Sequence, residues 1–203
     1  MHNKLLFLLF IFNLFACNNI VNKPENKPLA QNNKVIVKKH LKIGDTLDVF
    51  NDVYVIYNES MNNTSGRHLT NDGYNLGLKW QCVEFVKRYY HDYLDHKMPN
   101  TYGHAKDFFN PSIADGKLNR DRNLLQYSNS SKSKPKVHDL IVFKGNIFNS
   151  YGHVAIISEV GEDYIEIVQQ NVGKTSREKI DLETKDSKWI IDDSSVLGWL
   201  RKN

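Results

Sequence analysis

The sequence predicts an α+β domain in which one amphipathic helix packs on an antiparallel sheet. Residues 82–94 repeat apolar side chains every four positions, which is a helical period. Three runs rich in Val and Ile, at residues 139–143, 153–160 and 163–171, are typical of strands. With 203 residues, of which 40% are hydrophobic, the chain is long enough for one full core.

The first residues have the layout of an export signal. Lys4 precedes a short apolar run, and the small residues Ala16 and Cys17 end it. A spanning helix would need about 20 apolar residues, more than this run offers. The end of the run, Leu-Phe-Ala-Cys, resembles a bacterial lipobox. We therefore predict a lipoprotein signal peptide over residues 1–17, with Cys17 as the lipidated residue, and simple secretion with nearby cleavage as the alternative.

The next segment reads as a tether. Residues 18–40 are rich in Asn, Lys and Pro and lack a sustained apolar period, which favours a flexible linker. The folded domain is expected over residues 41–203, held in the bacterial cell envelope by the lipid on the membrane. The formal net charge of +4 is too mild to indicate a nucleic-acid partner. A monomer is expected.

The predicted helix over residues 82–94 has a wide apolar stripe and a polar face. The stripe is formed by Phe85, Val86, Tyr89, Tyr90, Tyr93 and Leu94. Glu84, Arg88 and Asp92 lie opposite, and their i,i+4 spacing suits ion pairs on a solvent-exposed face. Cys82 would then lie at the N-terminal end of a buried helix.

The remaining elements are strands and loops. A strand is expected at residues 53–57 and another at 195–200, whereas residues 98–134 are expected to be irregular. A two-residue turn, Gly161-Glu162, should join the strands at 153–160 and 163–171, with Gly161 supplying a positive φ.

Cys82 is the candidate nucleophile. An exported protein with two cysteines would usually pair them, but a lipidated or removed Cys17 leaves Cys82 without a partner. A helix N-terminus favours the thiolate, because its dipole and free backbone N–H groups attract negative charge. The same N–H groups could hold the oxyanion of a tetrahedral intermediate. The sequence therefore predicts an ionised, reactive thiol.

His153 is the candidate base among eight histidines. It opens a strand directly after Ser-Tyr-Gly, where its side chain can reach a cleft at the sheet edge. His68, His104 and His138 stay open as the other candidates for the base, and the alternative for each of the four is an ordinary surface or core histidine.

A catalytic imidazole needs a third group to hold its tautomer. Gln169 extends the apolar row of Ile165 and Ile167 on the neighbouring strand, where an unpaired amide would cost about 1–3 kcal/mol. An imidazole N–H would satisfy that amide. An amide bonded to main chain near a strand end is the alternative.

Five segments stand in this order along the chain: "GLKWQCVEFVKRYY", "KPKVHDLIVFKG", "YGHVAIISEV", "EIVQQNV" and "DDSSVLGWLRK". Together they resemble CHAP domains, the cysteine, histidine-dependent amidohydrolases/peptidases, and among them the amidase domain of bifunctional glutathionylspermidine synthetase/amidases. The resemblance implies a papain-like fold of the NlpC/P60-CHAP type, with Cys on the N-terminal helix and His on the sheet.

The resemblance also implies a nucleophile, base and orienting residue at Cys82, His153 and Gln169. The family usually has an acid where this chain has Gln169, and a small residue, usually Gly, where it has His138. Papain-like enzymes can use an amide as the orienting group, so the expected reaction is amide hydrolysis through a thioester.

The expected substrate is an amide or peptide. Trp80, Gln81 and Asn171 are expected to line the cleft, with simple packing as the alternative for Trp80. No metal or cofactor is required. Export favours a stem-peptide amide of peptidoglycan, whereas the resemblance favours a glutathionyl-polyamine amide. Gln169 keeps a third alternative open, a lipoprotein binding module with weakened catalysis.

Overall fold

The computed structural model describes residues 40–203, which contain one α-helix, one short 3-10 helix and twelve strands. The α+β class predicted from the sequence is confirmed. The predicted signal peptide, its Cys17 and all but the last residue of the tether lie outside the described residues. Within residues 40–203, no helix is long and apolar enough to cross a bilayer.

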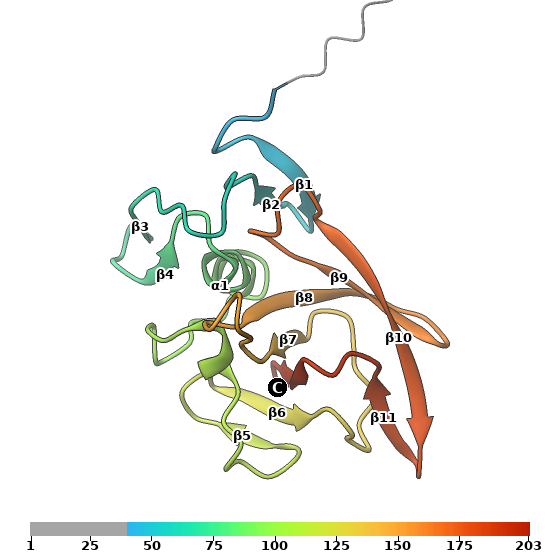
Figure 1. The fold of residues 1–203 in the computed structure, drawn as a ribbon. Helices are drawn as coiled ribbons and strands as arrows, with labels where there is room; N and C mark the ends of the chain where they lie inside the picture. The colour runs from blue at the N-terminus through green and yellow to red at the C-terminus, as the bar shows by residue number, and fades with distance from the viewer. Residues whose placement is uncertain (1–39) are drawn as a thin grey trace, which may run out of the picture. The chain divides into compact units, whose positions relative to one another are not determined.

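Eight strands form one antiparallel sheet, which curves around the middle of the domain (Figure 1). Their order is β11 (Lys188–Ile191), β10 (Arg177–Lys185), β9 (Tyr164–Val168), β8 (His153–Val160), β7 (Leu140–Phe143), β12 (Val196–Arg201), β6 (Leu124–Ser128) and β5 (Lys117–Asn119). Two hairpin-like pairs lie outside this sheet: β1 (Thr46–Phe50) with β2 (Val53–Ile56), and β3 (Arg67–Leu69) with β4 (Asn75–Leu78).

The single α-helix, α1 (Cys82–Asp92), packs against β8 (Figure 1). Its apolar stripe joins side chains from one face of the sheet in a core that includes Phe85, Val86, Tyr89, Tyr90, Val154, Ile156 and Val168. The opposite face of the sheet covers a second core around Trp199, Ile157 and Ile167. Both faces of the central strands are therefore buried, so their near-continuous apolar sequence is explained.

Two predicted details of the sheet region are wrong. Residues 98–134 are not wholly irregular, because they contain β5, β6 and a 3-10 helix, η1 (Ala105–Phe108). The turn between β8 and β9 spans three residues, and Gly161 has no positive φ. The glycine instead leaves room for the Tyr164 ring, since a Cβ there would lie 2.3 Å from a ring carbon unless that side chain shifted.

The predicted solvent exposure of the polar face of α1 is wrong for most of its length. Glu84 is fully buried and Arg88 is only 8% exposed, whereas both were expected to face solvent. The strand β4 crosses close to the helix, so that a Cβ on Gly77 would lie 3.3 Å from the Glu84 backbone. Asp92, one turn beyond Arg88, remains exposed and contacts His91 at 2.6 Å.

The buried carboxylate of Glu84 is fully paired. Arg88 Nε donates to it at 2.6 Å, Gln170 Nε2 donates at 2.9 Å, and His68 Nδ1 lies 2.7 Å away. Burial opposes its charge, but the hydrogen bonds from His68, Arg88 and Gln170 hold the pKa of Glu84 below its usual value. This cluster ties α1 to the residues that follow β9.

His138 occupies a position where the resemblance leads us to expect a small residue, usually glycine. Its φ is +77°, in the left-handed region that glycine adopts freely. The ring stacks on Tyr89, and its Nδ1 lies 2.7 Å from the Tyr89 hydroxyl oxygen. The contacts with Tyr89 hold the His138 ring in place in this backbone conformation.

Candidate functional site

A cavity of about 1100 Å³ opens at the N-terminal end of α1. Its wall contains five residues that the sequence singled out: Gln81, Cys82, His153, Gln169 and Asn171. They come from the start of α1, the start of β8 and the segment after β9, which are far apart in the chain. The fold therefore brings the predicted thiol, imidazole and amide to one cavity.

Trp80 is not among the residues that line this cavity. Its ring lies edge-on to the ring of His68, with 5.8 Å between ring centroids. Lys79 places its ammonium group 5.7 Å from the indole centroid on the same segment. The structure therefore gives Trp80 a packing role.

The N-terminus of α1 has no side-chain cap. Gln81, the N-cap residue, instead donates its amide N–H groups to the carbonyl oxygens of Asn63, at 2.7 Å, and Met61, at 3.0 Å. Its side-chain oxygen accepts from Asn171 Nδ2 at 2.7 Å. Because Gln81 is engaged in this way, no side chain caps the first-turn N–H groups beside Cys82.

The expectation of an ionised thiol is wrong. Burial raises the pKa of Cys82 to about 11, although the backbone N–H groups of Val154, Val83 and Cys82 itself act to lower it. Desolvation therefore outweighs the favourable effect of the helix N-terminus. No hydrogen bond joins Cys82 to His153 in the part of the chain that the structure describes, and the thiol is neutral near pH 7.

Gly152 allows His153 to start β8 on the cavity wall. Its φ is +76°, and a Cβ there would lie 2.5 Å from the carbonyl oxygen of Phe143. Only glycine fits both constraints without a shift of the backbone. His153 then pairs in register with Phe143 on β7, which fixes the backbone that carries the imidazole.

The His153 imidazole contacts the Gln169 side chain as the sequence suggested. Nε2 of His153 lies 2.9 Å from Oε1 of Gln169, and Gln169 is only 2% exposed. Burial lowers the pKa of His153 to about 4, although the hydrogen bond to Gln169 acts to raise it. The site thus contains a neutral thiol and a neutral imidazole near pH 7.

This low pKa predicts a loss of stability in acid. The unfolded chain protonates His153 near pH 6.5, whereas the folded chain does so only near pH 4. The contribution of His153 to the free energy of unfolding is therefore complete above pH 6.5 and is lost as the pH falls towards 4. At about 1.4 kcal/mol for each pH unit, it amounts to at most about 3 kcal/mol.

Urea unfolding of the wild type and His153→Gln at pH 7 and pH 4.5 measures this contribution. The difference in unfolding free energy between the two proteins should change by about 2 kcal/mol between these pH values. An unchanged difference would contradict a neutral His153 imidazole in the folded protein.

Gln170 is a positioning residue that the sequence did not reveal. Besides its bond to Glu84, its Oε1 accepts from the backbone N–H of Ile56 at 2.7 Å, and its Nε2 also lies 3.2 Å from the carbonyl oxygen of Gln81. Strand alternation places Gln170 opposite Gln169, which suggested no link to the site. Both side chains nevertheless support the site: Gln170 anchors α1, and Gln169 contacts His153.

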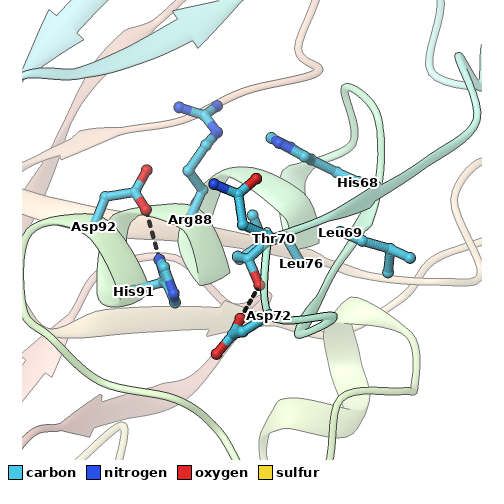
Figure 2. A pocket seen from close by; sticks show the side chains of 9 residues that line it. His68, Leu69, Thr70, Asp72, Leu76, Arg88, His91 and Asp92 are labelled. Atoms are coloured by element: carbon cyan, nitrogen blue, oxygen red, sulfur yellow. Dashed lines mark hydrogen bonds and ion pairs between the residues drawn. The ribbon is translucent and has the colours of Figure 1, made fainter.

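A second hollow, of about 500 Å³, lies beside the polar face of α1 and is lined in part by Arg88, His91 and Asp92 (Figure 2). Figure 2 shows His91 and Asp92 in contact on α1, with Thr70 bonded to Asp72 on the facing loop. Cys82 and His153 do not line it. Within residues 40–203, no group of three or more His, Cys, Asp or Glu side chains could hold a metal ion.

The domain has an α+β fold with a cavity that contains a thiol at a helix N-terminus and an imidazole paired with an amide. The family model of the CHAP domain matches residues 72–171, which include Cys82, His153 and Gln169. The chain therefore carries a CHAP domain. Such domains are generally amidases or peptidases, which supports a hydrolase.

Curated relatives lead to the same family. Trypanothione synthetase of Crithidia fasciculata is 30% identical over 148 residues, which are 67% of this chain and 23% of that protein. The bifunctional glutathionylspermidine synthetase/amidase of Escherichia coli (strain K12) is 29% identical over 139 residues, which are 62% of this chain and 22% of that protein. The chain spans less than a quarter of the length of these relatives.

One solved structure, "The crystal structure of Ly7917", aligns with 71% of this chain and 58% of its own at 15% identity, with a TM-score of 0.36.

Proposed function

We propose that this chain is a cysteine amide hydrolase that acts through a thioester on Cys82. The observation that carries the proposal is the shared cavity, in which Cys82 begins an uncapped helix and His153 is held by Gln169. The CHAP match over the same residues supports it. The papain-like arrangement implied by the resemblance is part of the proposal.

The mechanism follows from the neutral pair. Because burial disfavours both the thiolate and the imidazolium, the proton leaves Cys82 Sγ as the bond to the substrate carbonyl forms. His153 takes that proton on Nδ1, since Nε2 is occupied by Gln169. The first-turn N–H groups of α1 stabilise the oxyanion.

The second half of the reaction releases both products. The His153 imidazolium donates its proton to the leaving amine as the C–N bond breaks, which leaves an acyl group on Cys82. Water then attacks the thioester while His153 takes its proton. As the C–S bond breaks, His153 passes that proton to Cys82 Sγ, so the acyl group leaves as a carboxylic acid and the thiol is restored.

The proposed substrate is a peptide-stem amide of peptidoglycan. Its basis is the predicted export signal and the lipid on Cys17, which would hold a monomeric domain beside the cell wall. A glutathionyl-polyamine amide is the second candidate, because the relatives are named for glutathionylspermidine chemistry.

Two measurements test the proposal. Purified wall peptides and a glutathione–spermidine conjugate are incubated with the protein, and the released amine is quantified for each. Intact-mass analysis of samples quenched during turnover should show one acyl group, lost in Cys82→Ala. Absence of turnover and of any acyl adduct with both substrates would contradict the proposal.

One observation favours a binding module with weakened catalysis. A neutral thiol with a pKa of about 11, beside an imidazole oriented by an amide, lacks the charge of an activated pair. In that case Cys82→Ala would bind wall peptides as tightly as the wild type, and neither protein would release an amine.

A further inference from the structure

The amide of Gln169 can meet His153 in two orientations, and only one suits a base. With its oxygen towards Nε2, it accepts the Nε2–H and leaves Nδ1 without a proton. With its NH₂ towards Nε2, the imidazole must place its proton on Nδ1 and can no longer take one there. Something must therefore distinguish the two ends of the amide.

The group on the other side of Gln169 is a carboxylate. Gln169 Nε2 donates to Glu178 Oε2 at 3.0 Å. An ionised carboxylate has no proton to donate, so the NH₂ end must face Glu178 and the oxygen must face His153. Within residues 40–203, Gln169 Nε2 makes no other hydrogen bond. Glu178 makes no ion pair there that would compete with this contact.

The sheet holds Glu178 in place for this contact. The backbone N–H of Gln169 donates to the carbonyl oxygen of Ser176 at 2.9 Å, and Glu178 on β10 pairs in register with Ile167 on β9. The two strands run side by side (Figure 1). Glu178 is therefore the diagonal neighbour of Gln169 on the same face, within reach of a long side chain.

We propose that Glu178 is a positioning residue, which sets the orientation of the Gln169 amide and thereby the tautomer of His153. The family usually has an acid directly beside the imidazole. In this chain the carboxylate is that of Glu178, and the Gln169 amide lies between it and His153. The polarised amide transmits part of the carboxylate's negative charge to the imidazolium as it forms. This inference rests on the proposed function of His153 as base.

Removal of the carboxylate is the first test. Glu178→Ala should lower kcat by about 10- to 100-fold, as is usual for a group that orients a functional side chain through another, and leave KM within about twofold. ¹⁵N NMR of the unliganded protein at pH 7 should show His153 as the Nε2–H tautomer in the wild type and as a mixture in Glu178→Ala. Glu183→Ala, an exposed carboxylate on the same strand, is the matched control.

An exchange of the two side chains is the second test. Gln169→Glu places two carboxylates next to one another, and we expect at least about a tenfold loss of kcat. Gln169→Glu combined with Glu178→Gln restores an acceptor for Nε2–H and a donor behind it, so kcat should return to the wild-type value or exceed it. A loss in the double variant as large as that in Gln169→Glu would overturn the proposal.

The two proposals fail in different ways. If Cys82→Ala abolishes turnover while Glu178→Ala matches Glu183→Ala in kcat and in the His153 tautomer, the role of Glu178 is wrong and the hydrolase stands. If no amide is turned over but the tautomer still depends on Glu178, the reaction is wrong and the positioning role stands.

Discussion

Cys82→Ser is expected to lower amide turnover by at least about 1000-fold, because serine is a far weaker nucleophile beside a neutral imidazole. The neutral His153 that accepts a proton from a thiol of pKa about 11 cannot accept one as readily from an alcohol. Serine is close to cysteine in size, so the buried site should remain folded. Steady-state release of amine and circular dichroism measure the two effects.

The other cysteine of the chain supplies the control for this experiment. Cys17→Ser in the full chain should leave turnover of a soluble peptide substrate unchanged, because Cys17 lies outside the proposed chemistry. Equal activities of wild type, Cys17→Ser and Cys82→Ser would exclude a thioester on Cys82. A loss of turnover in Cys17→Ser alone would show that the reactive thiol is Cys17 and not Cys82.

Glu84→Ala is expected to lower the free energy of unfolding by about 3–5 kcal/mol, since it leaves the buried guanidinium of Arg88 without its carboxylate. The same change removes the nearer of the two acceptors of Gln170 Nε2. Urea denaturation at pH 7 measures the loss. Because Gln170 also anchors the start of α1, the variant should lose turnover in proportion to its unfolded fraction or more.

Asp92→Ala is the matched control on the same helix. The spacing of Glu84, Arg88 and Asp92 suggests one kind of surface ion pair, but the structure buries Glu84 and leaves the Asp92 side chain 48% exposed. An exposed pair contributes about 0–1 kcal/mol, so Asp92→Ala should change stability little. Similar losses of unfolding free energy in Glu84→Ala and Asp92→Ala would contradict the burial of the Glu84 ion pair.

The helix and the central strands could be predicted because their patterns are local. The apolar repeat of α1 and the Val- and Ile-rich runs of β7, β8 and β9 match the observed elements within a few residues. β10 escaped prediction because only Ile180 and Leu182 of its nine residues are buried, which gives too sparse an alternation.

The candidate site was predictable in its identities and less so in its electrostatics. Cys82, His153 and Gln169 share a cavity as expected, because strand order and helix packing follow from the elements that carry them. The charge of Cys82 and the burial of Glu84 depend on what lies across from them in space. Gln170 and Glu178 act through partners on other elements, which a linear pattern does not reveal.

The burial of Cys82 has a consequence for the lifetime of the protein. Peroxide and other oxidants attack sulfur as the thiolate, and a thiol with a pKa of about 11 offers less than about one part in a thousand of that form at pH 7. The resting protein should therefore resist sulfenic acid formation. The sulfur of Cys82 should then stay reduced in the resting protein when oxidants are present.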